Sequence, residues 1–158
     1  MKKIKLGKEQ AIQRIRHFCA YQERAQQEVR DRLYELGMTK SEVEEILSDL
    51  ISDTFLNEER FAIQFAGGHF KIKQWGRLKI QYALQQKRVS PVNIKKALKS
   101  INDSEYRKVM EALATKKWST LKGERGLSRM AKTQSFLHQR GFEPALMQSF
   151  LQQLHKGK

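Results

Sequence analysis

Residues 29–38 read Val29-Arg-Asp-Arg-Leu33-Tyr-Glu-Leu-Gly37-Met38, and the same pattern occurs twice more along the chain. It returns as Ile80-Gln-Tyr-Ala-Leu84-Gln-Gln-Lys-Arg88-Val89 and as Lys132-Thr-Gln-Ser-Phe136-Leu137-His-Gln-Arg-Gly141-Phe142. The matched leucines are 51 and 53 residues apart, and each is followed five residues later by an apolar residue beside a turn. A period near 50, with two helices meeting at a tight turn, indicates tandem units that bury a shared core.

Capping residues divide the rest of the chain into helices. Thr39 and Glu42 have the spacing of a capping box, and Asn57 is suited to begin the next helix. Pro91 and Pro144 mark two further starts, because proline fits the first helical position. The Val/Ile/Thr clusters typical of strands are absent. The expected helices cover residues 8–20, 23–36, 40–52, 57–69, 74–87, 91–101, 103–116, 125–140 and 144–155, with a loop at 117–125.

These features predict an all-α fold of three tandem three-helix repeats, about nine helices in all, elongated and curved. The expected domains are an N-terminal repeat over residues 1–53, a central basic repeat over 54–102 and a C-terminal repeat over 103–158. Because stacked repeats complete their own core, we expect a monomer.

Charge is distributed unevenly along the chain. The formal net charge is +14, yet residues 1–59 hold ten bases against twelve acids. From Arg60 to Asn102 there are ten Lys or Arg residues and no Asp or Glu. So concentrated a positive charge favours a polyanionic partner such as nucleic acid, whose phosphates it can neutralise. A solvated face that only aids solubility is the alternative interpretation.

Composition also bears on compartment and membrane. A lone cysteine, Cys19, rules out an intramolecular disulfide and suits a reducing compartment. No apolar run approaches the ~20 residues of a membrane span, and no hydrophobic signal region follows the basic start. We therefore expect a cytoplasmic protein without a membrane partner. Cys19 lies on a helical apolar pattern and is expected to be buried.

An enzymatic role is not expected. The four histidines are isolated from one another and lack metal-ligand spacing. Gly123-Glu-Arg-Gly126 lacks the Lys-Ser/Thr that follows in a phosphate-binding loop. The most basic stretch has no carboxylates, which a metal-dependent nuclease would need. The sequence thus predicts no catalytic residue, no metal site and no cofactor.

Three motifs stand in a recognisable order. They are Phe55-Leu-Asn-Glu-Glu-Arg-Phe-Ala62, then Trp75-Gly76-Arg77-Leu-Lys79-Ile-Gln-Tyr-Ala-Leu84, and Arg140-Gly141-Phe142 near the C-terminus. Together they resemble the RecX family, the regulatory proteins of the RecA recombinase, over about residues 8–153. Where that family has glycine at the second turn, this chain has Arg88, and a side chain is less comfortable there if the backbone is left-handed.

The resemblance implies a non-enzymatic regulator that binds the groove of the RecA–single-stranded DNA filament. It implies modulation, in the expected case inhibition, of the filament's ATPase, strand-exchange and co-protease activities in the SOS response. The implied partners are the RecA filament and single-stranded DNA, with double-stranded DNA left open. Two rival interpretations are a general DNA-binding repeat protein that acts without RecA and a helical scaffold for some acidic protein.

The candidate binding residues are the cations of the central stretch and one tryptophan: Lys71, Lys73, Trp75, Arg77, Lys79, Lys87, Arg88, Lys95, Lys96 and Lys99. Trp75 has two open interpretations, an aromatic wedge between helices or a platform for a base or a partner. Charge reversal at Arg77, Lys79 and Lys96 is expected to weaken filament binding while leaving helicity intact.

Overall fold

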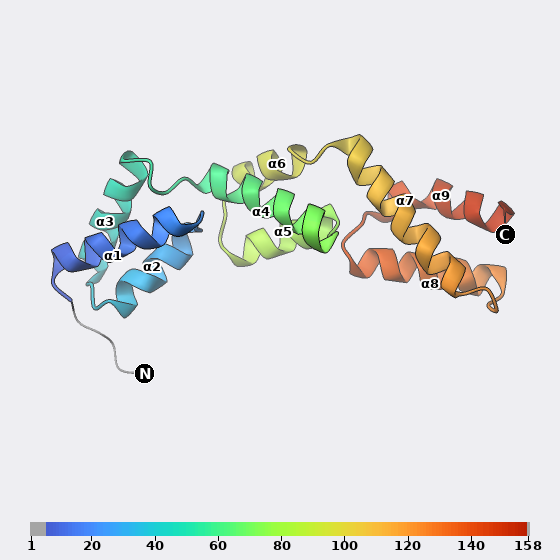
Figure 1. Cartoon of the computed structure of the whole chain (residues 1–158), viewed down its shortest axis with the longest axis horizontal. Helices are drawn as coiled ribbons and strands as arrows, with labels where there is room; N and C mark the ends of the chain where they lie inside the picture. The colour runs from blue at the N-terminus through green and yellow to red at the C-terminus, as the bar shows by residue number, and fades with distance from the viewer. Residues whose placement is uncertain (1–5, 158) are drawn as a thin grey trace. The chain divides into compact units, whose positions relative to one another are not determined.

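The computed structural model describes residues 6–157, and these form nine α-helices and no β-strand (Figure 1). The all-α prediction is confirmed. In chain order the helices are α1 (Lys8–Tyr21), α2 (Gln26–Glu35), α3 (Lys40–Ser52), α4 (Glu58–Lys73), α5 (Arg77–Gln86), α6 (Pro91–Lys99), α7 (Asp103–Thr120), α8 (Gly126–Gln139) and α9 (Pro144–Gly157).

The chain forms two compact units, and the central three helices contribute to both. The first unit contains the residues up to Phe65 together with Leu84–Ala97. The second contains Ala66–Ala83 together with the residues from Leu98 onward. Helices α4, α5 and α6 each have one part in either unit. The two units are defined by contacts in space and not by the sequence period. The expected boundaries of the three repeats therefore stay a prediction.

The repeated turn has the same hydrogen bonds in all three copies. The Met38, Val89 and Phe142 N–H groups donate to the carbonyl oxygens of Leu33, Leu84 and Leu137, each at 3.1 Å. The preceding residues Gly37, Arg88 and Gly141 donate to the carbonyl three positions back, at 2.9–3.0 Å. This pair of bonds defines the Schellman motif, in which an apolar residue after the turn packs on the helix before it. The sequence repeat is therefore a repeat of one helix-ending structure.

The three turns differ in the residue at the left-handed position. Gly37 and Gly141 have φ values of 90° and 98°, and Arg88 has φ of 59°. The strain expected from the sequence at Arg88 is therefore present in the backbone. A Cβ in this region is crowded by the adjacent carbonyl, whereas glycine adopts it freely.

The core of the first unit lies among α1, α2 and α3, which all contact one another. Ile15, Leu33 and Val43, one from each helix, have no solvent exposure. The predicted capping box at the start of α3 is present, with the Glu42 N–H donating to Thr39 Oγ1 at 3.3 Å and the Thr39 N–H to Glu42 Oε1 at 3.0 Å. Cys19 is buried as expected, and burial raises the pKa of its thiol to about 11.

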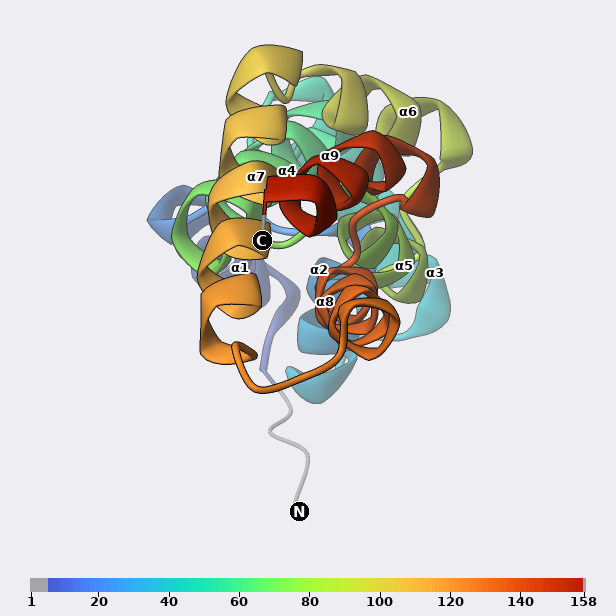
Figure 2. The same ribbon diagram turned by 90° about the vertical axis from the view of Figure 1, so that its right-hand side faces the viewer.

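The core of the second unit lies among α7, α8 and α9, which also contact one another (Figure 2). Three aromatic rings join these helices to the end of α4. The ring of Tyr106 lies 5.6 Å from that of Phe70 and 5.1 Å from that of Phe142. Such tilted aromatic pairs add to the stabilisation from burial alone. They fix the start of α7 against the turn that follows α8.

One expected loop is partly helical. The prediction of a loop over residues 117–125 is wrong for residues 117–120, because α7 continues to Thr120. The extra turn buries Trp118, which is only 5% exposed. Arg129 donates from Nε (2.9 Å) and Nη2 (2.6 Å) to the Trp118 carbonyl, which also accepts from the Leu121 N–H at 3.1 Å at the end of the helix. No stretch of described helix combines the length and apolar character that a bilayer span requires.

Candidate nucleic-acid interface

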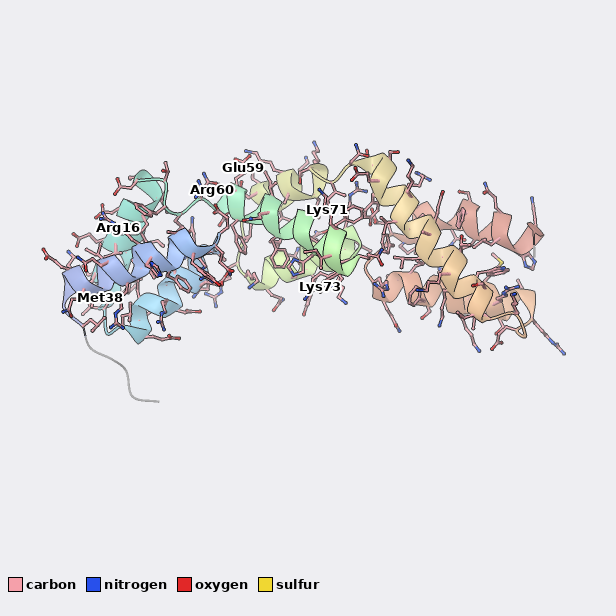
Figure 3. The ribbon with its side chains drawn as sticks, viewed as in Figure 1. Arg16, Met38, Glu59, Arg60, Lys71 and Lys73 are labelled. Carbon is pink, nitrogen blue, oxygen red and sulfur yellow. The ribbon has the colours of Figure 1, made fainter. Side chains whose placement is uncertain are left out.

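In the second unit, three candidate lysines lie around the junction between α4 and α5. Lys71 and Lys73 occupy the last turn of α4, where the helix dipole favours cations, and Lys79 is in the first turn of α5. Figure 3 shows Lys71 and Lys73 at the end of α4. All three side chains are exposed, and within residues 6–157 none of them forms an ion pair. Their charges are therefore available to an external anion.

Trp75 joins two of these lysines. The Lys73 and Lys79 ammonium groups lie 5.4 Å and 4.7 Å from the centre of the Trp75 ring, within cation–π range. The ring also packs on His69, with 4.6 Å between centroids, and Trp75 is half-buried. These contacts agree with the wedge interpretation, because the indole is already covered by its own chain. The groups near Trp75 that are most accessible to a ligand are therefore the ammonium groups of Lys73 and Lys79, which lie next to its ring.

Arg77 is turned away from this surface. Its guanidinium lies 2.6 Å from Asp103 Oδ1 and 3.7 Å from Glu143 Oε2, and its side chain is only 18% exposed. It also lies 4.0 Å from the centre of the Tyr106 ring. An arginine so paired in a partly buried site contributes chiefly to the fold. The direct contact predicted for Arg77 is not supported by this geometry and stays untested.

The backbone around Arg77 explains how the lysines are positioned. The first N–H groups of a helix have no acceptor within that helix. For α5, backbone carbonyls just after α8 accept two of these hydrogen bonds. Gly76 N–H donates to the Arg140 carbonyl at 2.7 Å, and Leu78 N–H donates to the Gly141 carbonyl at 2.9 Å. The Arg77 N–H donates to the Tyr106 hydroxyl at 2.9 Å. The start of α5, which carries Lys79, is thus fixed by groups from α7 and from the turn after α8.

The remaining candidate in this unit is Lys99, at the end of α6. It is exposed and forms no ion pair with a described residue. We observe no contact that joins it to the lysines around Trp75.

In the first unit, the candidate cations divide into paired and unpaired groups. Lys87 lies 3.8 Å from Glu28, and Lys96 lies 3.5 Å from Glu59. Arg88 and Lys95 are exposed and have no ion pair among the described residues. The acids that pair with these two lysines, Glu28 and Glu59, lie outside the acid-free stretch from Arg60 to Asn102. A count of charges along the sequence cannot show such pairs.

Glu58 and Arg60, the acid and the arginine of the first motif, have structural roles instead. Glu58 Oε1 accepts hydrogen bonds from Ser90 Oγ (2.6 Å), Asn93 Nδ2 (2.7 Å) and Ser90 N (3.1 Å). Burial acts to raise the pKa of Glu58, but these three donors outweigh it and the pKa is lowered. Arg60, labelled in Figure 3, pairs with Glu23 and donates to the Thr54 carbonyl at 3.0 Å. The motif therefore joins α4 to its neighbours.

Two features of the site were not predicted from the sequence. The partners of Arg77 come from α7 and from the turn before α9, so no local pattern indicates them. Tyr82 is 63% exposed on α5, one turn after Lys79, and offers an aromatic surface beside a cation. The inward stripe of Ile80 and Leu84 could have indicated it, because Tyr82 lies off that stripe. Within residues 6–157, no cluster of three His, Cys, Asp or Glu side chains could hold a metal ion.

Comparison with known proteins gives a consistent result. Residues 57–98 match the family model described as RecX, second three-helix domain. The chain is 30% identical over 116 residues to the regulatory protein RecX of Chlorobium limicola, covering 73% of this chain and 71% of that protein. It is 29% identical over 146 residues to the regulatory protein RecX of Prosthecochloris aestuarii, covering 91% and 93%. For the regulatory protein RecX of Oceanobacillus iheyensis the identity is 25% over 138 residues, and the chain spans about half (51%) of that protein's length.

Solved structures share the fold. The crystal structure of RecX from Lactobacillus salivarius superposes with a TM-score of 0.86 at 20% sequence identity, covering 93% of this chain and 96% of that one. A second crystal structure, of a regulatory protein RecX, gives a TM-score of 0.82 at 21% identity, covering 90% of this chain and 70% of that one. The fold with helical repeats is thereby confirmed.

Proposed function

The chain belongs to the RecX family of regulatory proteins, and from this we propose that it regulates the RecA recombinase by binding the RecA–single-stranded DNA filament. Its expected effect is inhibition of ATP hydrolysis, strand exchange and co-protease activity during the SOS response. The protein acts by binding and has no catalytic step of its own. We further propose that it works in the cytoplasm as a monomer.

The observation that carries this proposal is the set of uncompensated lysines around Trp75. Lys71, Lys73 and Lys79 are exposed and form no ion pair with a described residue. When such cations meet a polyanion, no internal ion pair must first be broken, and the release of counterions from the polyanion favours binding. A filament that contains single-stranded DNA presents phosphates, and a rigid junction between α4 and α5 can engage them.

Two carbonyls in the turn that follows α8 give this junction its rigidity. Because the first N–H groups of α5 are bonded to Arg140 and Gly141, the backbone that carries Lys79 does not have to become ordered upon binding. A preorganised cationic surface loses less conformational entropy when it binds. This supports a binding role for the second unit in particular.

Co-sedimentation with preformed RecA filaments tests the proposal. We expect the wild-type protein to pellet with filaments. The affinity of the Lys71→Glu/Lys73→Glu/Lys79→Glu variant for filaments should be lower by a factor of about ten or more. A matched control reverses the same number of exposed lysines elsewhere, as Lys40→Glu/Lys108→Glu/Lys116→Glu. Equal loss in both variants would show that only net charge matters and would contradict the site. Wild-type protein that stays in the supernatant would contradict the function.

The net charge of +14 also supports a second candidate, general DNA binding without RecA. In that case the protein binds bare DNA as tightly as it binds filaments, with affinity that falls steeply with salt. Measuring both affinities at one salt concentration separates the two functions. Tighter binding to the filament than to the bare strand favours regulation of RecA.

A further inference from the structure

A pocket in the first unit lies outside the basic stretch considered so far. Its volume is about 390 Å³, and it is lined by α1, by the turn that follows and by α2. The side chains that give it its chemical character are Arg14, His17, Phe18, Tyr21, Arg24 and Arg32. No carboxylate is among its lining residues in the described part of the chain. A cationic and aromatic pocket is unexpected here, because residues 1–59 carry more acids than bases.

Arg24, one of the lining residues of this pocket, is held in place by two contacts with Phe18. Its Nε donates to the Phe18 carbonyl at 3.0 Å, which satisfies an acceptor in the last turn of α1. Its guanidinium carbon lies 3.7 Å from the centre of the Phe18 ring. The guanidinium is therefore stacked on an aromatic ring and oriented before any ligand arrives. A planar, charged group fixed in this way is itself a surface on which another flat ring can stack.

Tyr21 provides a second flat surface. It is 77% exposed, and the Arg24 guanidinium carbon lies 5.9 Å from the centre of its ring. An aromatic side chain left so open has no role in the core of this unit. His17 and Arg14 lie one and two helical turns before Tyr21 on α1, on the same side of the helix, and both are exposed. Within residues 6–157, Arg14 has no ion-pair partner, whereas Arg32 is paired with Glu35 at 3.1 Å.

We propose that this pocket binds one nucleotide unit of a single-stranded nucleic acid. The base stacks against Tyr21 and the Arg24 guanidinium, and the adjoining phosphate is neutralised by Arg14. Flat aromatic and guanidinium surfaces next to free cations are the chemistry by which proteins bind unpaired bases without reading their sequence. An acidic peptide would use the cations but leave both flat surfaces without a matching group.

The site is separate from the lysines around Trp75 and does not depend on regulation of RecA. All of its lining residues belong to the first unit, and none of them is in the acid-free stretch from Arg60 to Asn102. The pocket would bind a base by stacking, whereas the lysines around Trp75 would bind phosphates by charge.

Photo-cross-linking with a 5-iodouracil-substituted oligonucleotide tests the site directly, with protein and DNA alone in solution. We expect the cross-linked base on Tyr21 or Phe18 when the peptides are identified by mass spectrometry. Cross-links found only elsewhere in the chain would overturn the proposal. A polyglutamate peptide that displaces the strand from the pocket at equimolar concentration would also overturn it, because the pocket would then prefer an acidic peptide to a base and phosphate.

Matched variants separate stacking from charge. Tyr21→Ala should weaken oligonucleotide binding about tenfold at every salt concentration, and Tyr21→Phe should restore it, since stacking needs only the ring. Arg14→Ala should reduce the slope of log affinity against log salt by about 0.7, the value for one phosphate contact. The control Arg16→Ala removes the same charge from the other side of α1, and Arg16 is labelled in Figure 3. There the Arg16 guanidinium lies 3.7 Å from Asp53 Oδ2. Unchanged binding by Tyr21→Ala would overturn the stacking role.

These assays contain no recombinase, so their failure is distinct from failure of the regulatory function. If Tyr21→Ala binds the strand normally but wild-type protein still binds filaments, only the pocket assignment falls. If the pocket binds the strand but filaments are not bound, only the regulatory function falls.

Discussion

Gly76 and Gly141 lie so close together that a Cβ on either one would overlap the backbone of the other's segment. A Cβ on Gly76 would meet the carbonyl group of Gly141, and a Cβ on Gly141 would meet the backbone N of Lys79. The two glycines come from different motifs of the family resemblance, 65 residues apart in the chain. Their close approach allows the end of α8 to accept hydrogen bonds from the start of α5. The motif glycines are thus required for packing rather than for contact with a partner.

Gly76→Ala should therefore destabilise the protein by about 2–4 kcal/mol, because the new methyl group forces α5 away from its hydrogen-bond acceptors. Urea denaturation followed by circular dichroism measures this change. Gly67→Ala is the control, since Gly67 lies within α4 and a Cβ there would meet nothing within 4 Å. That variant should be stabilised by up to about 1 kcal/mol, as alanine favours the helix. Similar effects of both substitutions would contradict the role of the Gly76–Gly141 approach.

Arg88→Gly should stabilise the protein by about 1 kcal/mol. Arg88 has φ of 59°, in the region where glycine pays no steric penalty and where the matching turns have Gly37 and Gly141. The midpoint of urea denaturation should rise without a change of slope. A matched substitution at Lys95, Lys95→Gly, places glycine inside α6 and should lower the midpoint instead. A loss of stability in Arg88→Gly would show that the turn is not strained.

Stability should depend on pH through Glu58. Because its pKa in the folded protein lies below the ordinary value of 4.5, its contribution is present above that value and is lost as the pH falls through the folded pKa. Near pH 7, Glu58→Gln should cost about 1 kcal/mol, since the amide accepts the bonds from Ser90 and Asn93 less strongly. Near pH 3 the difference from wild type should be smaller. A difference that stays constant across this range would contradict the depressed pKa of Glu58.

Tyr106→Phe should destabilise the second unit by about 1–3 kcal/mol. The hydroxyl donates to Glu143 and accepts from the Arg77 N–H, so its removal takes one hydrogen bond from each of these two partly buried groups. Burial and the hydrogen bond to Glu143 raise the pKa of Tyr106, which keeps the hydroxyl protonated. The double variant Tyr106→Phe/Glu143→Gln should lose less than the sum of the single losses. Strict additivity would show that the two side chains act independently.

Much of the fold could be predicted because the second helix of each three-helix repeat ends in the same way. Each of the three segments contains a leucine, then a residue with left-handed backbone, then an apolar residue. All three segments form the same turn. The predicted loop at residues 117–125 was wrong only for residues 117–120, where Trp118 is buried and Arg129 bonds its carbonyl, a contact between segments that local helix signals do not contain. The local sequence pattern therefore predicts which segments are helical. It does not predict the end of a helix that is lengthened by tertiary contacts.

The candidate site was harder to predict for a similar reason. A run of cations without acids indicates a basic surface only if no acid approaches from elsewhere in the chain. Asp103 and Glu143 approach Arg77, and Glu59 approaches Lys96, from outside that run. The earlier triple variant of Arg77, Lys79 and Lys96 would therefore break two ion-paired groups, and loss of stability could imitate loss of binding. Lys71, Lys73 and Lys79 give the cleaner test, because none of them forms an ion pair with a residue in the range 6–157.

The decisive measurement is the rate of single-stranded-DNA-dependent ATP hydrolysis by preformed RecA filaments as this protein is titrated in. We expect inhibition well below one copy per RecA protomer, unrelieved by a moderate excess of DNA and weakened in the Lys71→Glu/Lys73→Glu/Lys79→Glu variant. No effect on hydrolysis, or inhibition that excess DNA abolishes, would contradict a filament-directed regulator and leave a basic protein that competes for the strand.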